Sequence, residues 1–139
     1  MLVIVAGARL GKSLAEQLIS RKINVAVIDS NGKTLESLAQ ETPSLSTIQG
    51  KEWKPEILYK AGAEKADALV ALTKRDEDNV MIAMMVKNHF RIPRVLALIN
   101  DPVHEWLFSK DLGVDAALIP NDLIADAAIS SIQTASSRD

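Results

Sequence analysis

Residues 6–11, Ala-Gly-Ala-Arg-Leu-Gly, form a glycine-containing turn between an apolar run and a helical pattern. Such a turn points the backbone N–H groups of a helix N-terminus at a ligand, which favours phosphate. In the dinucleotide-binding pattern Gly-x-Gly-x-x-Gly, the glycines allow a tight turn, close approach to a pyrophosphate and close helix–strand packing. The segment therefore predicts a phosphate-binding loop, although a strand-to-helix turn without a ligand would also use these residues.

The loop departs from that pattern at two positions. Ala6 and Ala8 stand where the first and second glycines belong, and only the third glycine is retained. Gly7 fills an intervening position and can supply the turn instead. We expect the Ala8 methyl group to push a diphosphate outward or weaken its binding, and Arg9 or Lys12 to add positive charge.

Asp29 ends the second apolar run, about 20 residues after the loop, where an acid can accept hydrogen bonds from both hydroxyls of a ribose. A carboxylate there repels a 2′-phosphate, so NADP is disfavoured. Any residue of the segment 29–31, Asp-Ser-Asn, could instead cap the next helix, and the two roles can coexist.

Two more strand ends complete the predicted site. Thr73 ends the fourth run, and Lys74 and Arg75 after it could meet phosphates or form a solvated turn. The segment 49–51 ends the third run and could line the adenine edge or be an ordinary strand terminus. The predicted nucleotide site comprises Ala6, Gly7, Ala8, Arg9, Leu10, Gly11, Asp29, Ser30, Gly50, Lys51, Thr73 and Lys74.

No catalytic or metal centre is predicted. The chain has no cysteine, which excludes thiolate zinc sites and cysteine nucleophiles. His89 and His104 have no ligand cluster beside them, and His104 is expected to be structural. No Ser/His/Asp arrangement suggests a nucleophile, so we expect no enzymatic activity.

The elements that position these residues alternate between strand and helix. Strands are predicted at 2–6, 24–29, 45–49, 68–73, 95–99 and 116–119, with helical patterns between and after them. This alternation predicts an α/β fold, a Rossmann-like doubly wound parallel six-stranded sheet of order 3-2-1-4-5-6. Ligands of such sheets bind where the strand order reverses, above the first and fourth strands.

The bulk composition agrees with one globular domain. The chain has 139 residues, 47% of them hydrophobic, 24% charged and 4% aromatic, with a net charge of −2. The charge gives no indication of a nucleic-acid partner. No apolar run approaches the roughly 20 residues that a membrane-spanning helix needs.

These motifs, in their order, resemble the N-terminal lobe of the RCK domain (regulator of potassium conductance), also called the TrkA-N domain. The resemblance covers about 1–133, which is expected to form the nucleotide-binding domain, with 134–139 as a flexible tail. The segments that carry it are 11–15, 27–29, 58–62, 66–73, 76–79, 100–104, 107–108 and 112–115.

The resemblance implies a cytoplasmic regulatory domain at the inner face of the membrane, which senses NAD(H), ATP, ADP or AMP for a potassium channel or transporter. It implies a homo-oligomer, a dimer or an octameric ring, and ligand roles for Asp29 at the ribose, Thr73 near the phosphates and the backbone of 6–10. The smaller C-terminal lobe of the family does not follow in this sequence.

Besides the two missing loop glycines, the sequence departs from the family at two places. Lys51 replaces an acid that often contacts adenine, and Leu98 replaces an arginine usually close to the ligand. These losses predict a weakened or altered site. They also leave open a degenerate Rossmann domain that acts as an oligomerisation module. A third alternative is a fragment of an NAD-dependent oxidoreductase, although neither a catalytic acid or base nor a substrate domain is visible.

Two helical segments carry more apolar side chains than one face requires. The segment 80–86 contains three methionines, which suit core filling or a subunit contact equally. The final helix, which begins at Pro120, carries Leu123, Ile124 and Ile132. We expect these side chains to pack on their own domain, while the family resemblance offers a partner lobe instead.

Overall fold

The computed structural model describes the backbone of residues 1–136 and their side chains except those of Lys110 and Ser136. The fold is a six-stranded parallel sheet of order β3-β2-β1-β4-β5-β6, as predicted. Its strands are β1 (Leu2–Ala6), β2 (Asn24–Asp29), β3 (Ser46–Gln49), β4 (Ala68–Ala71), β5 (Arg94–Leu98) and β6 (Ala116–Leu118). The order reverses between β1 and β4.

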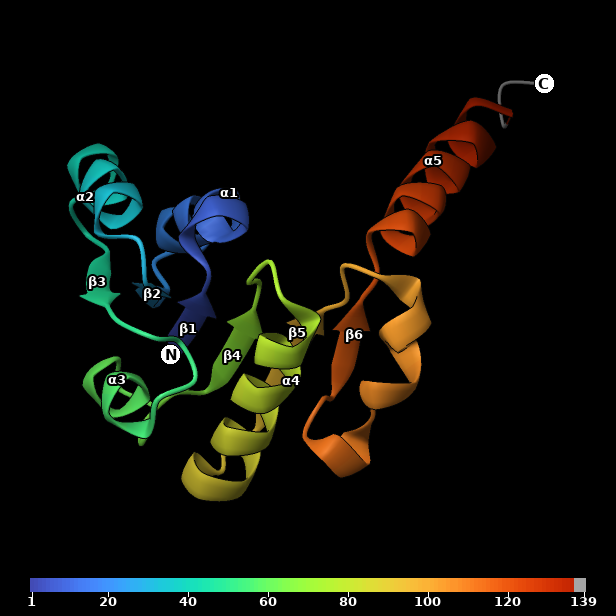
Figure 1. The fold of residues 1–139 in the computed structure, drawn as a ribbon. Helices are drawn as coiled ribbons and strands as arrows, with labels where there is room; N and C mark the ends of the chain where they lie inside the picture. Colours follow the sequence, from blue (N-terminus) through green and yellow to red (C-terminus); the bar gives the residue numbers. More distant parts are fainter. Residues whose placement is uncertain (137–139) are drawn as a thin grey trace.

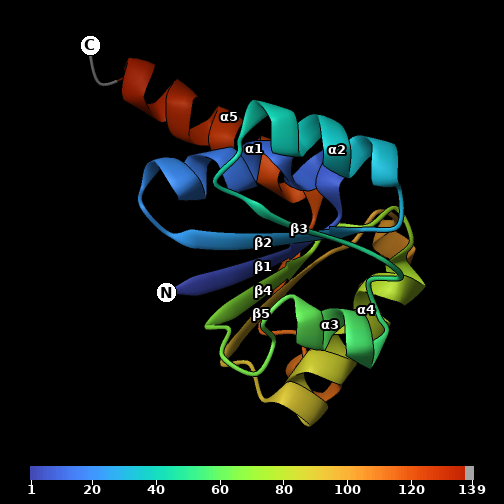
Figure 2. The ribbon, with the colours of Figure 1, turned by 90° about the vertical axis from the view of Figure 1, so that its left-hand side faces the viewer.

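Helices cover both faces of the sheet (Figure 2). The first face carries α1 (Ala8–Ser20) and α2 (Gly32–Glu41), and the opposite face carries α3 (Pro55–Lys60) and α4 (Asp76–Met85). A π-helical turn (η1, Val86–Phe90) extends α4, and two 3₁₀ segments (η2, Pro102–Leu107, and η3, Lys110–Leu112) join β5 to β6. The chain then continues into α5 (Pro120–Ser136).

Alternating side chains of the strands separate two hydrophobic cores. In β1, Val3 and Val5 pack towards α1 and α2, whereas Ile4 and Ala6 pack with the residues of α3 and α4. This period of two is expected for a strand that is buried on both faces. The packing fixes the register of β1 between β2 and β4, and so places the carboxyl ends of these three strands side by side.

Element boundaries differ modestly from the predictions. β4 ends at Ala71, so Thr73 lies in the loop that follows the strand rather than in it. α1 begins at Ala8, two residues before its apolar periodicity begins. The segment after Asp101 forms a 3₁₀ helix capped by the Asp101 carboxylate, which accepts a hydrogen bond from the amide of Val103.

α5 extends away from the body of the domain (Figure 1). The prediction that its apolar side chains pack on their own domain is wrong: Leu123, Ile124, Ile129 and Ile132 are between 50% and 67% exposed. The segment expected as a tail begins as the last turn of α5, and residues 137–139 lie outside the described part of the chain. Within residues 1–136, no helix is long and apolar enough to cross a membrane.

Candidate nucleotide site

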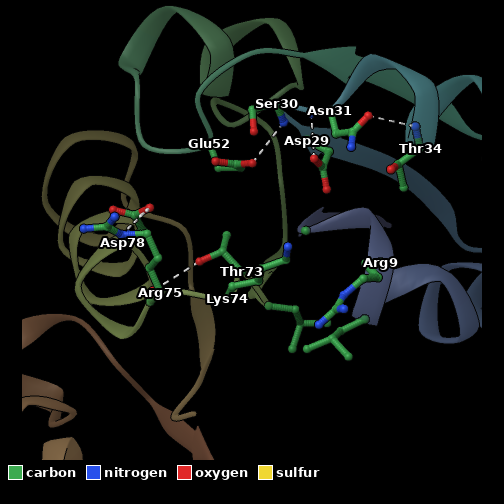
Figure 3. A pocket seen from close by; sticks show the side chains of 13 residues that line it. Arg9, Asp29, Ser30, Asn31, Thr34, Glu52, Thr73, Lys74, Arg75 and Asp78 are labelled. Carbon is green, nitrogen blue, oxygen red and sulfur yellow. Dashed lines mark hydrogen bonds and ion pairs between the residues drawn. The ribbon is translucent and has the colours of Figure 1, made fainter. Parts of the chain in front are cut away.

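A cavity of about 330 Å³ lies at the carboxyl ends of β1, β2 and β4, where the strand order reverses. Figure 3 shows Asp29, Ser30 and Glu52 on one side and Thr73, Lys74 and Arg9 on the other. The lining residues are Gly7, Arg9, Leu10, Asp29, Ser30, Asn31, Thr34, Glu52, Leu72, Thr73, Lys74, Arg75 and Asp78.

Gly7 makes the turn from β1 into α1. Its φ of 117° lies in a region that residues with a side chain rarely adopt, and a Cβ atom here would stand 2.5 Å from the carbonyl oxygen of Leu72. The absence of a side chain therefore lets the loop lie directly against the end of β4. The turn brings the first amides of α1 to the same cavity as the end of β4.

This turn corrects the expectation for Ala8. Its methyl group packs in the core with Val5 and Ala15 and is not on the cavity wall, so it does not push a ligand outward. The reason is that the chain turns at Gly7, which makes Ala8 the first residue of α1, with its side chain directed towards the sheet.

The Asp29 carboxylate lies on the cavity wall and is held by two backbone amides. Oδ2 accepts a hydrogen bond from the amide of Ala8 at 2.7 Å, and Oδ1 accepts one from the amide of Asn31 at 2.8 Å. Because each carboxylate oxygen can accept two hydrogen bonds, both keep a free lone pair for a ribose hydroxyl. The side chain is thus oriented before any ligand arrives.

The capping of α2 is separate from this role. The N-cap is Asn31, whose side-chain oxygen accepts hydrogen bonds from the amides of Lys33 and Thr34 at 3.0 and 3.2 Å. Of the three candidates in the Asp-Ser-Asn segment, the structure therefore uses the last one as the cap and leaves Asp29 on the cavity wall.

The opposite wall offers amide and cationic donors. The amides of Arg9 and Leu10 belong to the first turn of α1, where backbone N–H groups have no partner inside the helix. Neither amide, and neither the Arg9 nor the Lys74 side chain, has a partner among the described residues. Arg75, by contrast, forms ion pairs with Glu77 at 3.0 Å and Asp78 at 3.8 Å.

Thr73 is fixed by Asn79, a fully buried residue of α4. The Asn79 side-chain oxygen accepts from the amide of Thr73 at 3.0 Å and lies 2.6 Å from its hydroxyl oxygen. The Asn79 NH₂ group donates to the carbonyls of Thr73 and Leu98 at 3.1 and 3.0 Å. Since the Thr73 hydroxyl proton is shared between Asn79 and the Arg75 carbonyl, phosphate contacts fall first to the free donors of Arg9, Leu10 and Lys74.

The sequence analysis missed four residues that line the cavity, Thr34, Leu72, Asp78 and Glu52, and Glu52 is the one of these that is buried and charged. It is buried, and its carboxylate accepts a hydrogen bond from the amide of Ser30 at 3.0 Å. Burial raises the pKa of this carboxyl group above its ordinary value, and the nearby Asp29 adds to the rise. The only signal in the sequence was an acid two residues after Gly50 in an otherwise basic stretch, and the predicted residue Lys51 is exposed beside it.

The predicted residues fall into two groups. Gly7, Arg9, Leu10, Asp29, Ser30, Thr73 and Lys74 line the cavity. The predicted residues that do not line it are Ala6, Ala8, Gly11, Gly50 and Lys51. Among these, Gly11 lies against Val5 and Gly50 against Ile57, so both glycines serve close packing.

A second polar network, centred on Asp76, holds the Thr73 side of the cavity. The buried Asp76 carboxylate accepts hydrogen bonds from the Asn100 and Asp101 amides at 2.6 and 2.9 Å and pairs with His104 Nδ1 at 2.7 Å. The Asn100 side chain donates both to Asp76 and to the Thr73 carbonyl. His104 thus has the structural role that was expected of it.

The Asp76–His104 pair predicts a pH dependence of stability. The hydrogen bond to Asp76 raises the pKa of His104 above 6.5. Burial opposes ionisation of Asp76, but hydrogen bonds from His104 and Asn100 outweigh it and lower the pKa of Asp76 below 3.8. The charged pair stabilises the fold fully at pH values below the pKa of His104 in the unfolded chain. This contribution is lost as the pH rises through the pKa of His104 in the folded protein.

We therefore expect the stability advantage of the wild type over His104→Gln to be largest below pH 6.5 and to shrink as the pH rises above that value. Denaturant unfolding of both proteins at a series of pH values measures it. A difference that stays constant across this range would show that the pair does not form as a charged pair.

Comparison with known proteins agrees with the fold and its family. A family model described as the TrkA-N domain matches residues 2–120. The Trk system potassium uptake protein TrkA of Mycobacterium tuberculosis is 33% identical over 126 residues, which are 90% of this chain and 56% of that protein. The chain therefore spans only about half the length of this relative.

Solved structures share the fold at low sequence identity. The TrkA-N domain of the Escherichia coli inner membrane protein ybaL has a TM-score of 0.80 at 17% identity, covering 92% of this chain and 93% of its own. An AMP-bound Kef C-terminal domain of Shewanella denitrificans has a TM-score of 0.76 at 20% identity, covering 96% of this chain and 81% of its own. The NAD-bound GsuK channel has a TM-score of 0.68 at 21% identity, covering 85% of this chain and 21% of its own.

Proposed function

The chain belongs to the TrkA-N domain family, and we propose that it is the adenine-nucleotide-sensing domain of a potassium channel or transporter system. It binds NAD(H), ATP, ADP or AMP without converting the nucleotide chemically. It transmits the change between the nucleotide-bound and unbound states through a homo-oligomer. It acts from the cytoplasmic side, at the inner face of the membrane, on a membrane-spanning partner. The relative in M. tuberculosis is named a potassium uptake protein, and the similar structures carry AMP in one case and NAD in another.

The observation that carries this proposal is the division of charge across one cavity. Asp29 and Glu52 line one wall, which suits the hydroxyls and amino groups of a nucleoside. Arg9 and Lys74, with two free helix amides, line the other, which suits phosphate. A nucleoside phosphate is the ligand class with this polarity, and the two carboxylates disfavour a further phosphate on the ribose.

Regulation requires that two ligands stabilise different arrangements of the oligomer. A ligand shifts such an equilibrium only by the difference in its affinity for the two states. The four large apolar side chains that α5 exposes (Leu123, Ile124, Ile129 and Ile132) support an assembly, because exposed apolar surface often marks a protein–protein contact.

Calorimetric titration of the chain with AMP, ADP, ATP and NADH, joined to thermal unfolding, tests the binding step. We expect heat of binding and a raised unfolding temperature with at least one nucleotide. No heat and no thermal shift with any of the four would refute a nucleotide sensor.

A second candidate function is an oligomerisation module without a ligand. It is favoured by the exposed apolar side chains of α5 and by the buried Leu98 at the position where the family has an arginine. Light scattering on the titrated samples separates the two functions: a stable oligomer that binds none of the nucleotides would support the module.

A further inference from the structure

The cavity lies mainly on one side of the point where the strand order reverses, towards β1 and β2. Its walls come from the ends of β1, β2 and β4, from the first turn of α1, from α2, from the first turn of α4 and from Glu52 after β3. Among the described residues, none beyond Asp78 lines it. In a doubly wound sheet, a dinucleotide extends across both halves, so its second nucleoside would have to lie beyond β4, towards β5.

The boundary between the halves is closed by a side-chain clasp, formed by Asn79 and Asn100. Asn79 donates to the carbonyls of Thr73 and Leu98, and so joins the end of β4 to the end of β5. Asn100 donates to the same Thr73 carbonyl at 3.1 Å and to Asp76 Oδ1 at 2.9 Å.

Under this clasp the end of β5 is packed rather than open. Leu98 is 6% exposed, and Ile99, which follows it, is fully buried. All four hydrogen-bonding positions of the Asn79 amide are used within the protein, so it offers no donor to a ligand. Among the described residues, the end of β5 therefore adds no wall to this cavity, and the Asn79 amide adds no free donor.

We propose that the site recognises only the AMP portion of its ligand and gives no binding surface to the nicotinamide half of a dinucleotide. This inference rests on the proposed nucleotide-sensing function and narrows its ligand class. The volume agrees, because about 330 Å³ lies at the lower end of the range for small-molecule pockets. The phosphates of AMP, ADP or ATP extend along Arg9 and Lys74 to solvent, whereas NADH binds through its AMP half alone.

Saturation-transfer NMR on NADH tests the inference directly, because it reports which ligand protons touch the protein. We expect strong saturation on the adenine protons and the adjacent ribose proton, and weak saturation on the nicotinamide protons. Equal saturation of both rings would overturn the inference and leave nucleotide binding intact. No saturation, together with no heat from any nucleotide, would instead refute the proposed function itself.

Affinity gives a second readout. AMP and NADH share the adenosine and its first phosphate, so a second binding half would show as tighter NADH binding. We expect NADH to bind no more than about threefold tighter than AMP, a difference below 1 kcal/mol. A larger advantage for NADH would contradict the clasp as a boundary.

The variant Asn100→Ala tests whether the Asn100 side chain only positions Thr73 or also contacts the second nucleoside of a dinucleotide. If Asn100 acts only through Thr73, the variant changes the AMP and NADH dissociation constants by the same factor. A loss confined to NADH would show that the second nucleoside touches the end of β5, and would overturn the inference. Circular dichroism of the variant checks that the fold is retained.

Discussion

Replacement of Asp29 by alanine is expected to weaken AMP binding by about 100-fold or more. Hydrogen bonds to a charged group contribute about 1.5–3 kcal/mol each, and the carboxylate has a free lone pair on each oxygen for a ribose hydroxyl. Calorimetric titration of wild type and variant with AMP measures the ratio of dissociation constants.

The same substitution has a cost in stability that must be measured separately. Asp29 holds the amides of Ala8 and Asn31, so its removal destabilises the fold by about 1–3 kcal/mol. The matched control is Glu36→Ala, which removes the same charge from an exposed position of α2 outside the cavity. Equal losses of affinity in both variants would mean that charge alone, and not the ribose contact, explains the effect.

The second large effect is expected from Gly7→Ala, which should destabilise the domain by about 2–5 kcal/mol. The added methyl group would stand 2.5 Å from the Leu72 carbonyl oxygen, at a φ of 117° that alanine rarely adopts. Relief of this contact requires α1 to move away from the end of β4, which also widens the cavity. Denaturant unfolding measures the loss of stability.

Gly32→Ala is the matched control for this change. Gly32 is the first residue of α2, and a Cβ atom there meets only the end of the flexible Gln49 side chain. Both variants remove the same backbone freedom from the unfolded chain, so the difference between them isolates the native-state strain. If Gly7→Ala proves as stable as Gly32→Ala, the tight approach of the Gly7 turn to the end of β4 is absent.

The sheet and its order were predictable because local and global signals agree. Short apolar runs alternate with helical patterns, and parallel strands buried on both faces leave few topologies that satisfy right-handed crossovers. β1 illustrates the pattern: Val3 and Val5 fill one of the two cores, and Ile4 and Ala6 fill the other. Boundaries were less accurate, because the end of β4 depends on the hydrogen bonds of Thr73 rather than on its β-branched side chain.

The site residues that were predicted correctly lie at the end of a strand or shortly after it. Asp29, Ser30 and Thr73 line the cavity for that reason, as do Gly7 and Arg9 in the first loop. Ala8 was misjudged because sequence spacing does not show which way a loop side chain points.

Two other features depended on tertiary contacts. Glu52 reaches the cavity through a hydrogen bond to Ser30 that joins two loops distant in the sequence. The exposure of α5 was missed for a related reason: an apolar helical pattern does not say whether its partner is the same chain or another copy.

The central claim is that an adenosine ribose binds at Asp29 while its phosphate meets the first turn of α1. A crystal structure of the chain soaked with AMP tests it most directly. The account predicts both ribose hydroxyls within hydrogen-bond distance of the Asp29 carboxylate, and the phosphate at the amides of Arg9 and Leu10. AMP bound elsewhere, or a cavity that stays empty at saturating AMP, would contradict it.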